Sequence, residues 1–432
     1  MSSANPSTGS RGEHVHSLED WTRYGDELRR PLCIAEGLKQ APSICIVGAG
    51  LSGLSVAFRL ATKRPDLRIE IVEKSDRCGG TIETWKQGEW ICDVAVNATR
   101  THPAFWRLVD DLGLGASFTP SKPTAATRWI SVEGRRRKLS FWTVLKNGPL
   151  KLLRGLRKGR RGGQSVGEAV PLSPLNDAMT LGIVNDRSAN VDADFLMPSM
   201  TRFGENPPVK WRKVKKLMSG TYPLFRPRNG TTASFKGGMQ TLIDGLVQRL
   251  ESLDNVSLTL NAPARTPQEL AEARGLPLSA LIWCAPLSRK PADFTHLNVY
   301  AAGYTADATA SVPLGYGTLV PDPASPVSGV LHESDVHGSP RAPPGHRLFR
   351  IMSPAEQTGS DIEVKTALRH LLCEAEPVLF EKIGERSIPS YPPGYMASLV
   401  PTSPEFTRAG WFYSGVSVTH VVAEAERIAE AF

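Results

Sequence analysis

The chain contains 432 residues, of which 41% are hydrophobic and 22% charged, so it is long enough for two or three domains with buried cores. Its net charge of +8 arises in residues 135–163, which hold eleven lysines and arginines and no acidic residue, whereas the rest carries 40 basic and 43 acidic residues. No apolar run reaches the ~18 residues of a membrane-spanning helix, so any membrane contact must come from one side. The six cysteines form no Cys-x-x-Cys pair, which favours free thiols over a disulfide-dependent fold.

Residues 1–41 form an N-terminal extension to which we assign no structure. Leu18, Trp21, Tyr24 and Leu28 recur at helical spacing within it. Its six acidic residues argue against an ordinary transit peptide, which is poor in acidic residues.

The first firm elements are a strand, a glycine-rich turn, a helix and a second strand. The apolar run Ile44–Val47 predicts a buried strand, and apolar residues at helical spacing from Leu51 predict a helix behind the glycines. Ile69–Glu73 predicts the second strand. The order is that of a dinucleotide-binding unit.

The glycines in the turn have the spacing Gly-x-Gly-x-x-Gly. Gly48 allows a sharp turn, Gly50 leaves room for a pyrophosphate and Gly53 allows the helix to pack on the strand. Glu73 follows twenty residues after Gly53, where a carboxylate accepts a ribose hydroxyl. The glycine motif alone would also fit an ordinary turn, but its strand, helix and acidic residue favour dinucleotide binding.

A second cofactor contact is predicted directly after the second strand, in Lys74–Thr81. Arg77 supplies positive charge, and the adjacent Gly79 and Gly80 let the backbone pass close to a ligand. The alternative is a surface turn with a solvated arginine.

With this segment, Glu73 to Gly80, the sequence resembles the superfamily of flavin-dependent amine oxidases and protoporphyrinogen oxidases. Its members follow Gly-x-Gly-x-x-Gly with Glu-x-x-x-Arg-x-Gly-Gly, and NAD dehydrogenases resemble this chain less well. The resemblance implies FAD as the cofactor. The contacts it implies in this part of the chain are Gly48, Gly50, Ser52, Gly53, Glu73, Lys74, Arg77, Gly79, Gly80 and Thr81.

The resemblance continues to the C-terminus. Ser234–Leu242 is similar to a segment that returns to the flavin domain and opens a helix, and Ala409–Val418 resembles the closing Ala-Gly-x-x-Tyr-x-Gly-Val-x-Val motif before a last helix. The closing motif implies further cofactor contacts at Gly410, Val416, Ser417 and Val418. Ala95, Val96 and Asn97 stand where protoporphyrinogen oxidases carry Gly-Pro-Arg, and this element therefore departs from the family pattern.

Two residues are candidates for substrate binding. Arg128 opens a strand that resembles the family strand whose arginine grips a propionate of the tetrapyrrole, and a guanidinium suits this because its planar fork donates two parallel hydrogen bonds to one carboxylate. Tyr316, in Gly315–Pro321, takes the aromatic position that packs against the flat substrate. Without the family, Arg128 would be read as a surface residue and Tyr316 as part of a hairpin turn.

The basic segment 135–163 interleaves leucines and aromatic residues with unopposed positive charge. This pattern favours a pair of surface helices on an anionic membrane, where each Lys or Arg near the surface contributes about 1 kcal/mol. Nucleic-acid binding ranks lower because no nucleic-acid fold signature accompanies the charges. A solvated basic face is the third interpretation.

The predicted fold is α/β (α+β), with a discontinuous Rossmann-like FAD-binding domain, a mixed-sheet substrate domain and a basic helical membrane-contacting insertion. The predicted FAD-binding domain comprises residues 42–115, 229–286 and 397–432. The substrate and membrane-contacting region is 116–228, and the substrate domain is 287–396.

The resemblance implies an oxygen-dependent protoporphyrinogen oxidase in which the flavin performs the chemistry. It implies a tetrapyrrole substrate, molecular oxygen, a monotopic contact with the inner mitochondrial membrane, a possible homodimer, and neither a metal nor a nucleic-acid partner. No His, Ser or paired carboxylate presents itself as an obligatory acid or base. The alternatives are a related FAD oxidase or desaturase on another flat substrate, such as coproporphyrinogen, and a non-catalytic membrane-associated FAD scaffold.

Overall fold

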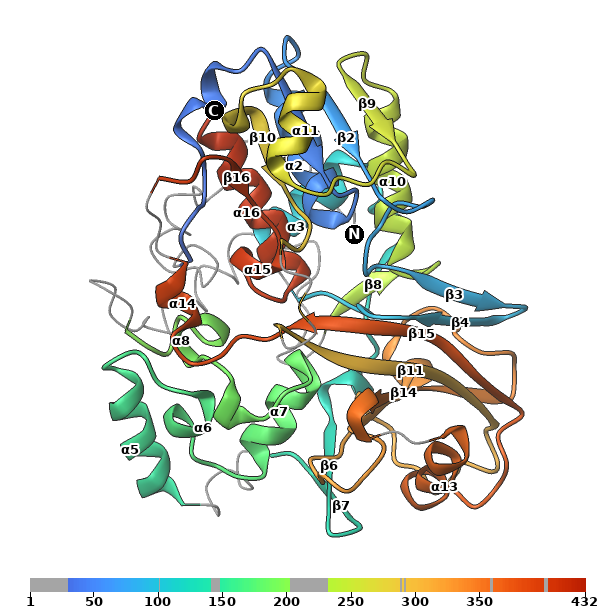
Figure 1. Ribbon diagram of the computed structural model, residues 1–432. Helices are drawn as coiled ribbons and strands as arrows, with labels where there is room; N and C mark the ends of the chain where they lie inside the picture. Colours follow the sequence, from blue (N-terminus) through green and yellow to red (C-terminus); the bar gives the residue numbers. More distant parts are fainter. Residues whose placement is uncertain are drawn as a thin grey trace, which may run out of the picture.

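The computed structural model describes residues 30–100, 102–140, 148–202, 232–287, 290, 293–357, 360–399 and 403–432. In this part of the chain two sheets lie one above the other, the smaller near the C-terminus and the larger below it (Figure 1). Leu18, Trp21, Tyr24 and Leu28, which recur at helical spacing, lie outside the described residues.

The smaller sheet has five strands in the order β16-β10-β1-β2-β9, and every pair is parallel. Its strands, from one edge to the other, are β16 (Thr407–Arg408), β10 (Leu281–Trp283), β1 (Ser43–Val47), β2 (Arg68–Val72) and β9 (Val256–Thr259). The order joins three distant parts of the sequence, so the predicted discontinuous, Rossmann-like fold is confirmed. Four of the five residues of β1 are buried, as expected for a central parallel strand.

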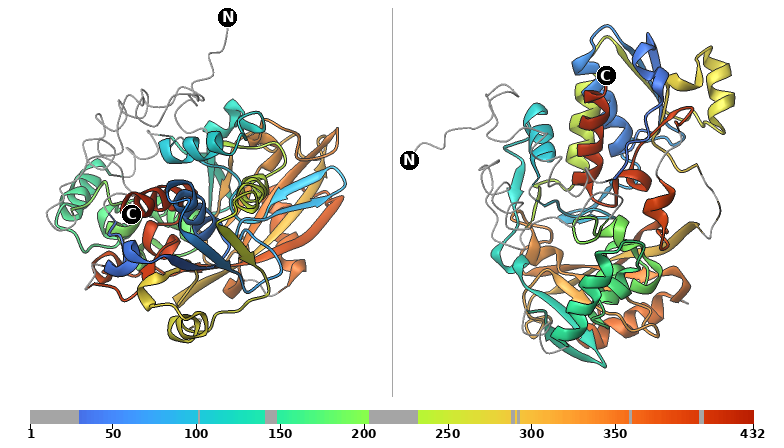
Figure 2. Two further views of the ribbon diagram at one scale, coloured as in Figure 1. Left: turned by 90° about the horizontal axis from the view of Figure 1, so that it is seen from above. Right: turned by 90° about the vertical axis from the view of Figure 1, so that its left-hand side faces the viewer.

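Helices cover this sheet and form the main core with it. They include α2 (Leu51–Lys63), α3 (Pro103–Asp111), α10 (Gln240–Glu251), α11 (Pro267–Arg274), α15 (Trp411–Ser414) and α16 (Val418–Glu430). The predicted helices after Gly50, after Met239 and after Ser417 are thus confirmed. Packing of α16 and α10 on α2 places the C-terminal helix beside the first one, which Figure 2 shows from above.

The larger sheet has seven strands in the order β15-β11-β14-β13-β12-β6-β7. All its pairs are antiparallel except β12 with β6, so the predicted mixed sheet is confirmed. Its strands in the same order are Leu379–Pro389, Phe294–Thr305, His346–Pro354, Gly329–Leu331, Gly317–Leu319, Arg128–Val132 and Arg135–Lys138. Helices α12 (Glu333–Val336) and α13 (Asp361–Leu371) follow β13 and β14.

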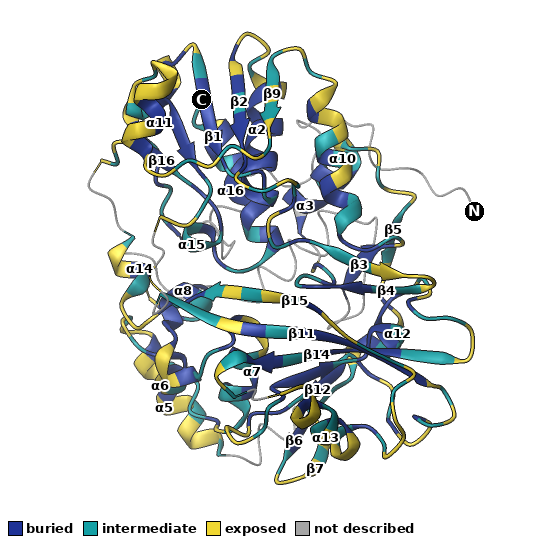
Figure 3. Ribbon diagram, turned by 45° about the vertical axis from the view of Figure 1, so that its right-hand side comes forward, coloured by how far each residue is buried: buried dark blue, intermediate teal, exposed yellow. Residues whose placement is uncertain are grey.

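The fold also contains two short strand pairs and a group of small helices. The strand pairs are β3 (Thr84–Gln87) with β4 (Trp90–Asp93) and β5 (Phe118–Pro120) with β8 (Ala233–Phe235). The helices are α5 (Pro149–Gly159), α6 (Val166–Ala169), α7 (Leu175–Val184), α8 (Ala193–Leu196) and α14 (Tyr395–Ser398). Of these helices, α5, α6 and α7 lie to the side of the larger sheet (Figure 1). Figure 3 shows that strands such as β1 and β14 are mostly buried, whereas α5, α10 and α11 present exposed residues.

The expectation of two helices in the basic segment is wrong in its first half. Arg135–Lys138 is strand β7, paired antiparallel with β6. Glu133 and Gly134 have positive φ angles of 51° and 70°, which is typical of the tight turn that closes a two-residue hairpin, and this turn determines the strand. The second half does contain a helix, α5, whereas residues 141–147 lie outside the described part.

No helix in the described part of the chain is long and apolar enough to cross a bilayer. The six cysteines are free, as their spacing indicated. The predicted domain boundaries stay a prediction.

Candidate cofactor and substrate site

The glycine turn after β1 requires glycine at two positions. Gly48 has a φ of 101°, a left-handed conformation that side chains disfavour. At Gly53, a Cβ atom would lie 1.9 Å from the carbonyl oxygen of Gly48, so any side chain there would force α2 away from β1. The resulting close packing leaves the N-terminus of α2 at the turn, with Gly50 as its N-cap and no side chain capping it. Such an N-terminus presents backbone N–H groups and partial positive charge to a phosphate.

Glu73 is held firmly at the end of β2. Its Oε2 accepts a hydrogen bond from the N–H of Ala49 at 2.8 Å, and its Oε1 accepts from the N–H and Oγ of Ser75 at 2.9 and 2.6 Å. The residue is only 8% exposed. Since each carboxylate oxygen has two lone pairs, acceptor capacity remains for a ribose hydroxyl.

The second glycine pair lies directly against the first turn. Gly79 donates to the carbonyl of Ala49 at 2.8 Å, and a Cβ atom at Gly80 would be 3.3 Å from the Cα of Gly50. Gly79 and Gly80 have φ angles of 114° and 59°, so both need the freedom of glycine. The two glycine segments therefore lie in direct contact.

Arg77 organises this loop. It donates to the carbonyl oxygens of Cys78, Gly80 and Ile82 at 3.2, 2.8 and 3.3 Å, and it pairs with Glu83 at 3.0 Å. These contacts fix the backbone path through the glycines. Direct binding of the cofactor by Arg77 stays a prediction.

The closing segment reaches the same place from the other end of the chain. Gly410 has a φ of 107°, and a Cβ atom there would lie 3.4 Å from Ser52 Oγ on α2. Its N–H donates to Glu424 Oε2 at 2.6 Å. Burial raises the pKa of Glu424 to about 8. Ser417 caps the N-terminus of α16 by accepting from the N–H of Thr419 at 3.4 Å.

These segments line one cavity of about 950 Å³. The predicted cofactor residues in its wall are Gly48, Gly50, Ser52, Glu73, Lys74, Gly79, Gly80, Thr81, Gly410, Val416, Ser417 and Val418. Gly53 and Arg77 are not in the wall, because Gly53 packs behind the turn and Arg77 supports the second loop. The volume, the glycine-lined turns and the free helix N-terminus fit a dinucleotide such as FAD.

The far side of the cavity is formed by the larger sheet and the turn after β4. Apolar residues dominate it, with Val94, Ala95, Val96, Leu181, Ile183, Leu297, Val299, Met352 and Ile388 in the wall. Two cations, Arg350 and Arg386, lie among them. The altered element Ala95–Asn97 thus contributes two aliphatic residues to the cavity, and Arg350 holds this turn by donating to the carbonyls of Asp93 and Ala95 at 2.5 and 2.9 Å.

Arg128 and Tyr316 lie together, but neither is a lining residue of this cavity. The guanidinium carbon of Arg128 is 4.7 Å from the ring centroid of Tyr316, whose hydroxyl donates to Asn97 Oδ1 at 3.1 Å. Partial burial lowers the pKa of Arg128. The structure therefore joins the two substrate candidates and ties them to the altered element, and their role in substrate binding stays a prediction.

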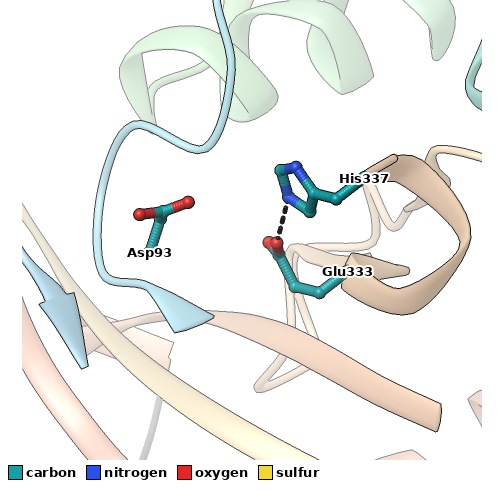
Figure 4. Close-up of side chains that lie close together, drawn as sticks. All are labelled: Asp93, Glu333 and His337. Carbon is teal, nitrogen blue, oxygen red and sulfur yellow. Dashed lines mark hydrogen bonds and ion pairs between the residues drawn. The ribbon is translucent and has the colours of Figure 1, made fainter. Parts of the chain in front are cut away.

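A buried ionic cluster beside the cavity was not foreseen from the sequence. Figure 4 shows Asp93, Glu333 and His337, with His337 Nε2 2.7 Å from Glu333 Oε2. Arg341 pairs with Asp93 at 3.3 Å and Arg350 with Glu333 at 3.2 Å. Burial opposes ionisation of Glu333, but Arg350 and His337 outweigh it and lower its pKa to about 2. The guanidinium groups already neutralise both carboxylates, so the cluster is an ionic clamp between β4, α12 and β14. The spacing of Glu333 and His337 by four residues was its one local signal.

Comparison with known proteins supports this picture. Residues 46–112 match the family model of an NAD(P)-binding Rossmann-like domain. The chain is 23% identical to protoporphyrinogen oxidase from Schizosaccharomyces pombe, in an alignment covering 83% of this chain and 90% of that protein. A thiamine thiazole synthase from Ajellomyces capsulatus is 39% identical over 80 residues, which cover 18% of this chain and 22% of that protein, so this second likeness is local.

Two solved structures share the fold over most of their length. A provisionally assigned protoporphyrinogen oxidase from Exiguobacterium sp. 255-15 aligns with a TM-score of 0.63 and 16% identity, covering 90% of this chain and 98% of that one. Cyclohexylamine oxidase from Brevibacterium oxydans IH-35A aligns with a TM-score of 0.59 and 16% identity, with the same coverage. The resemblance to the protoporphyrinogen oxidases and flavin amine oxidases is thus confirmed for the fold and for most of the chain, and FAD is the cofactor that these comparisons support.

Proposed function

We propose that the protein is an FAD-dependent oxidase that converts protoporphyrinogen IX to protoporphyrin IX. Three two-electron steps remove six hydrogen atoms from the macrocycle, and three molecules of oxygen take them up as three molecules of hydrogen peroxide. The observation that carries the proposal is that one cavity is lined both by the dinucleotide turn and by apolar residues of the larger sheet.

When bound, FAD supplies the redox chemistry by accepting a hydride and passing electrons to oxygen. The protein residues have binding and orienting roles. The glycine turns and the N-terminus of α2 would hold the pyrophosphate, and Glu73 would accept hydrogen bonds from the ribose hydroxyls. Val416–Val418 and the turn Val94–Val96 are far apart in the sequence, and both line the cavity.

The apolar wall suits a flat, mostly hydrocarbon substrate. Leu297, Val299 and Met352 lie on adjacent strands β11 and β14 and exclude water from the cavity. Arg128 and Tyr316, stacked on each other, are proposed to hold a propionate and one face of the macrocycle at the outer end of the site.

We also propose that the protein acts at the inner mitochondrial membrane and touches it with α5. Leu150 and Leu153 on this helix are 72% and 55% exposed. Lys151, Arg154, Arg157 and Lys158 accompany them on the same helix, which contains no acidic residue. Exposed leucines among cations are typical of helices that lie on anionic lipid. The homodimer stays a prediction.

The test is fluorimetric detection of protoporphyrin formed from protoporphyrinogen IX by the purified, FAD-loaded protein. Wild type is expected to turn over, and Arg128→Ala is expected to lose most of this activity while keeping its FAD. Arg369→Ala serves as the matched control and is expected to be fully active. It removes an exposed arginine of α13 that pairs with Glu376.

Two further measurements separate the alternatives. Equal or faster oxidation of coproporphyrinogen, which has four carboxylates, would favour a related oxidase. A yellow protein whose flavin is not bleached by protoporphyrinogen under anaerobic conditions would contradict the enzymatic proposal and favour a scaffold.

A further inference from the structure

Arg386 is a cation in the wall of the cavity that the sequence did not single out. It lies on β15 opposite Leu297 of β11, another lining residue. Its guanidinium lies over Gly384, where a Cβ atom would be 3.8 Å from Nη2 and 2.6 Å from the side chain of Val94. The side chain is 11% exposed. The charge is therefore enclosed beside Val94, another residue of the cavity wall.

Among the described residues, the guanidinium of Arg386 pairs with one carboxylate, that of Glu83, and Arg77 pairs with the same carboxylate. Nη2 of Arg386 is 3.3 Å from Glu83 Oε2, and Nη2 of Arg77 is 3.0 Å from the same oxygen. The Nε of Arg386 has no acceptor among the described residues. Glu83 alone thus faces two guanidinium groups, and the fork of Arg386 retains an unused donor.

The neighbouring ionic clamp supplies no further negative charge. Asp93 is paired with Arg341 and Glu333 with Arg350, and these pairs are buried. Outside this clamp, Arg386 and Arg77 share a single carboxylate, that of Glu83. An enclosed surplus cation is costly unless an anion joins it. Binding of one negatively charged group next to Arg386 in the cavity wall is therefore favourable.

We propose that Arg386 binds a carboxylate of the substrate inside the cavity. The inference deepens the proposed function and rests on it for the kind of substrate, a flat aromatic acid. A guanidinium fork matches a carboxylate with two parallel hydrogen bonds. Arg128, the carboxylate-binding residue that the sequence predicts, is not in the cavity wall, so Arg386 forms a separate site.

The test compares a flat aromatic acid with its ester in the FAD-loaded protein. The probes are 2-naphthoate and methyl 2-naphthoate, titrated while the flavin absorbance is recorded. Wild type is expected to bind the acid about ten- to a hundredfold more tightly than the ester, as for a charge-assisted hydrogen bond. Arg386→Met is expected to abolish this preference, and Arg386→Lys to restore part of it.

Glu83→Gln provides a test in the opposite direction. Removing the competing carboxylate frees the guanidinium, so this variant is expected to bind 2-naphthoate more tightly than wild type does. Arg369→Met is the matched control, because Arg369 lies on α13 and is not in the cavity wall; it should not change either affinity.

The proposal is wrong if wild type does not distinguish the acid from the ester, or if Arg386→Met keeps the preference. It is also wrong if Arg386→Met shifts only the reduction potential of the flavin, since the charge would then serve the cofactor. An acid preference that depends on Arg386 in a protein that forms no protoporphyrin would support the carboxylate site and refute only the proposed function.

Discussion

The replacement Glu424→Gln tests whether a carboxyl group beneath the cofactor site is neutral in the folded protein. Glu424 lies in α16, is 3% exposed, and accepts a hydrogen bond from the N–H of Gly410. Burial is the main reason that its pKa rises from 4.5 to about 8, while Gly410, Arg427 and Arg30 act in the opposite direction. A glutamine side chain has nearly the same shape and retains an oxygen that can accept from Gly410.

The sign of the effect follows from proton binding. Between pH 4.5 and about 8 the folded state holds a proton that the unfolded state releases, so the stability that Glu424 contributes is full below pH 4.5 and is lost as the pH rises through about 8. At about 1.4 kcal/mol per pKa unit, raising the pH from 5 to 9 should cost wild type up to about 4 kcal/mol. The Glu424→Gln variant has no group to ionise at this position and therefore avoids the loss.

The assay is the midpoint of thermal unfolding of both proteins, FAD-loaded, from pH 5 to pH 9. The two midpoints should nearly agree at pH 5, and that of Glu424→Gln should exceed that of wild type by about 5 °C at pH 9. Glu426→Gln is the control on the same helix. Glu426 pairs with Arg59 and Arg107, so losing its charge should destabilise the protein already at neutral pH. A constant difference between wild type and Glu424→Gln across this range would refute the reasoning, because it would show that Glu424 does not titrate there.

Three further predictions concern the glycine turn, the ionic clamp and α5. Gly53→Ala should lower FAD affinity at least a hundredfold, because a Cβ atom would lie 1.9 Å from the Gly48 carbonyl oxygen. The affinity is measured by flavin fluorescence during titration. Gly113→Ala is the control and should leave FAD binding unchanged, because nothing lies within 4 Å of a Cβ atom there, although φ is 68°. Asp93→Ala should lower the free energy of unfolding, measured with urea, by about 3–5 kcal/mol. The substitution leaves Arg341 without its carboxylate and removes the acceptor for Met239 N–H and Thr84 Oγ1. A decrease below about 1 kcal/mol would contradict the ionic clamp. Replacing Leu150 and Leu153 with Ser should reduce sedimentation with anionic vesicles several-fold, and unchanged binding would exclude α5 as the contact.

The sequence predicted those parts of the fold that are determined by residues close together in the sequence. The strand, turn and helix from Ser43 to Lys63 carry their own signals, namely apolar runs, helical spacing and glycines at positions where a side chain would collide. The helices α10 and α16 were expected as well, because the segments that open them resemble family motifs. The hairpin β6-β7 was missed because the charges of Arg135–Lys138 dominated the interpretation, whereas the turn at Glu133 and Gly134 determines the structure.

The parts of the site that were missed depend on contacts between distant residues. Glu83 and Arg386 are 303 positions apart, and Asp93 and Arg350 are 257 apart, so no local spacing connects them. Each of these charged residues, read by itself, would be assigned to the surface, because burial of an unpaired charge is too costly. Only the stacking of the larger sheet against the β3-β4 hairpin brings the partners together. This is also why the proposed carboxylate site at Arg386 follows from the three-dimensional arrangement, in which Arg386 and Arg77 share one carboxylate, that of Glu83.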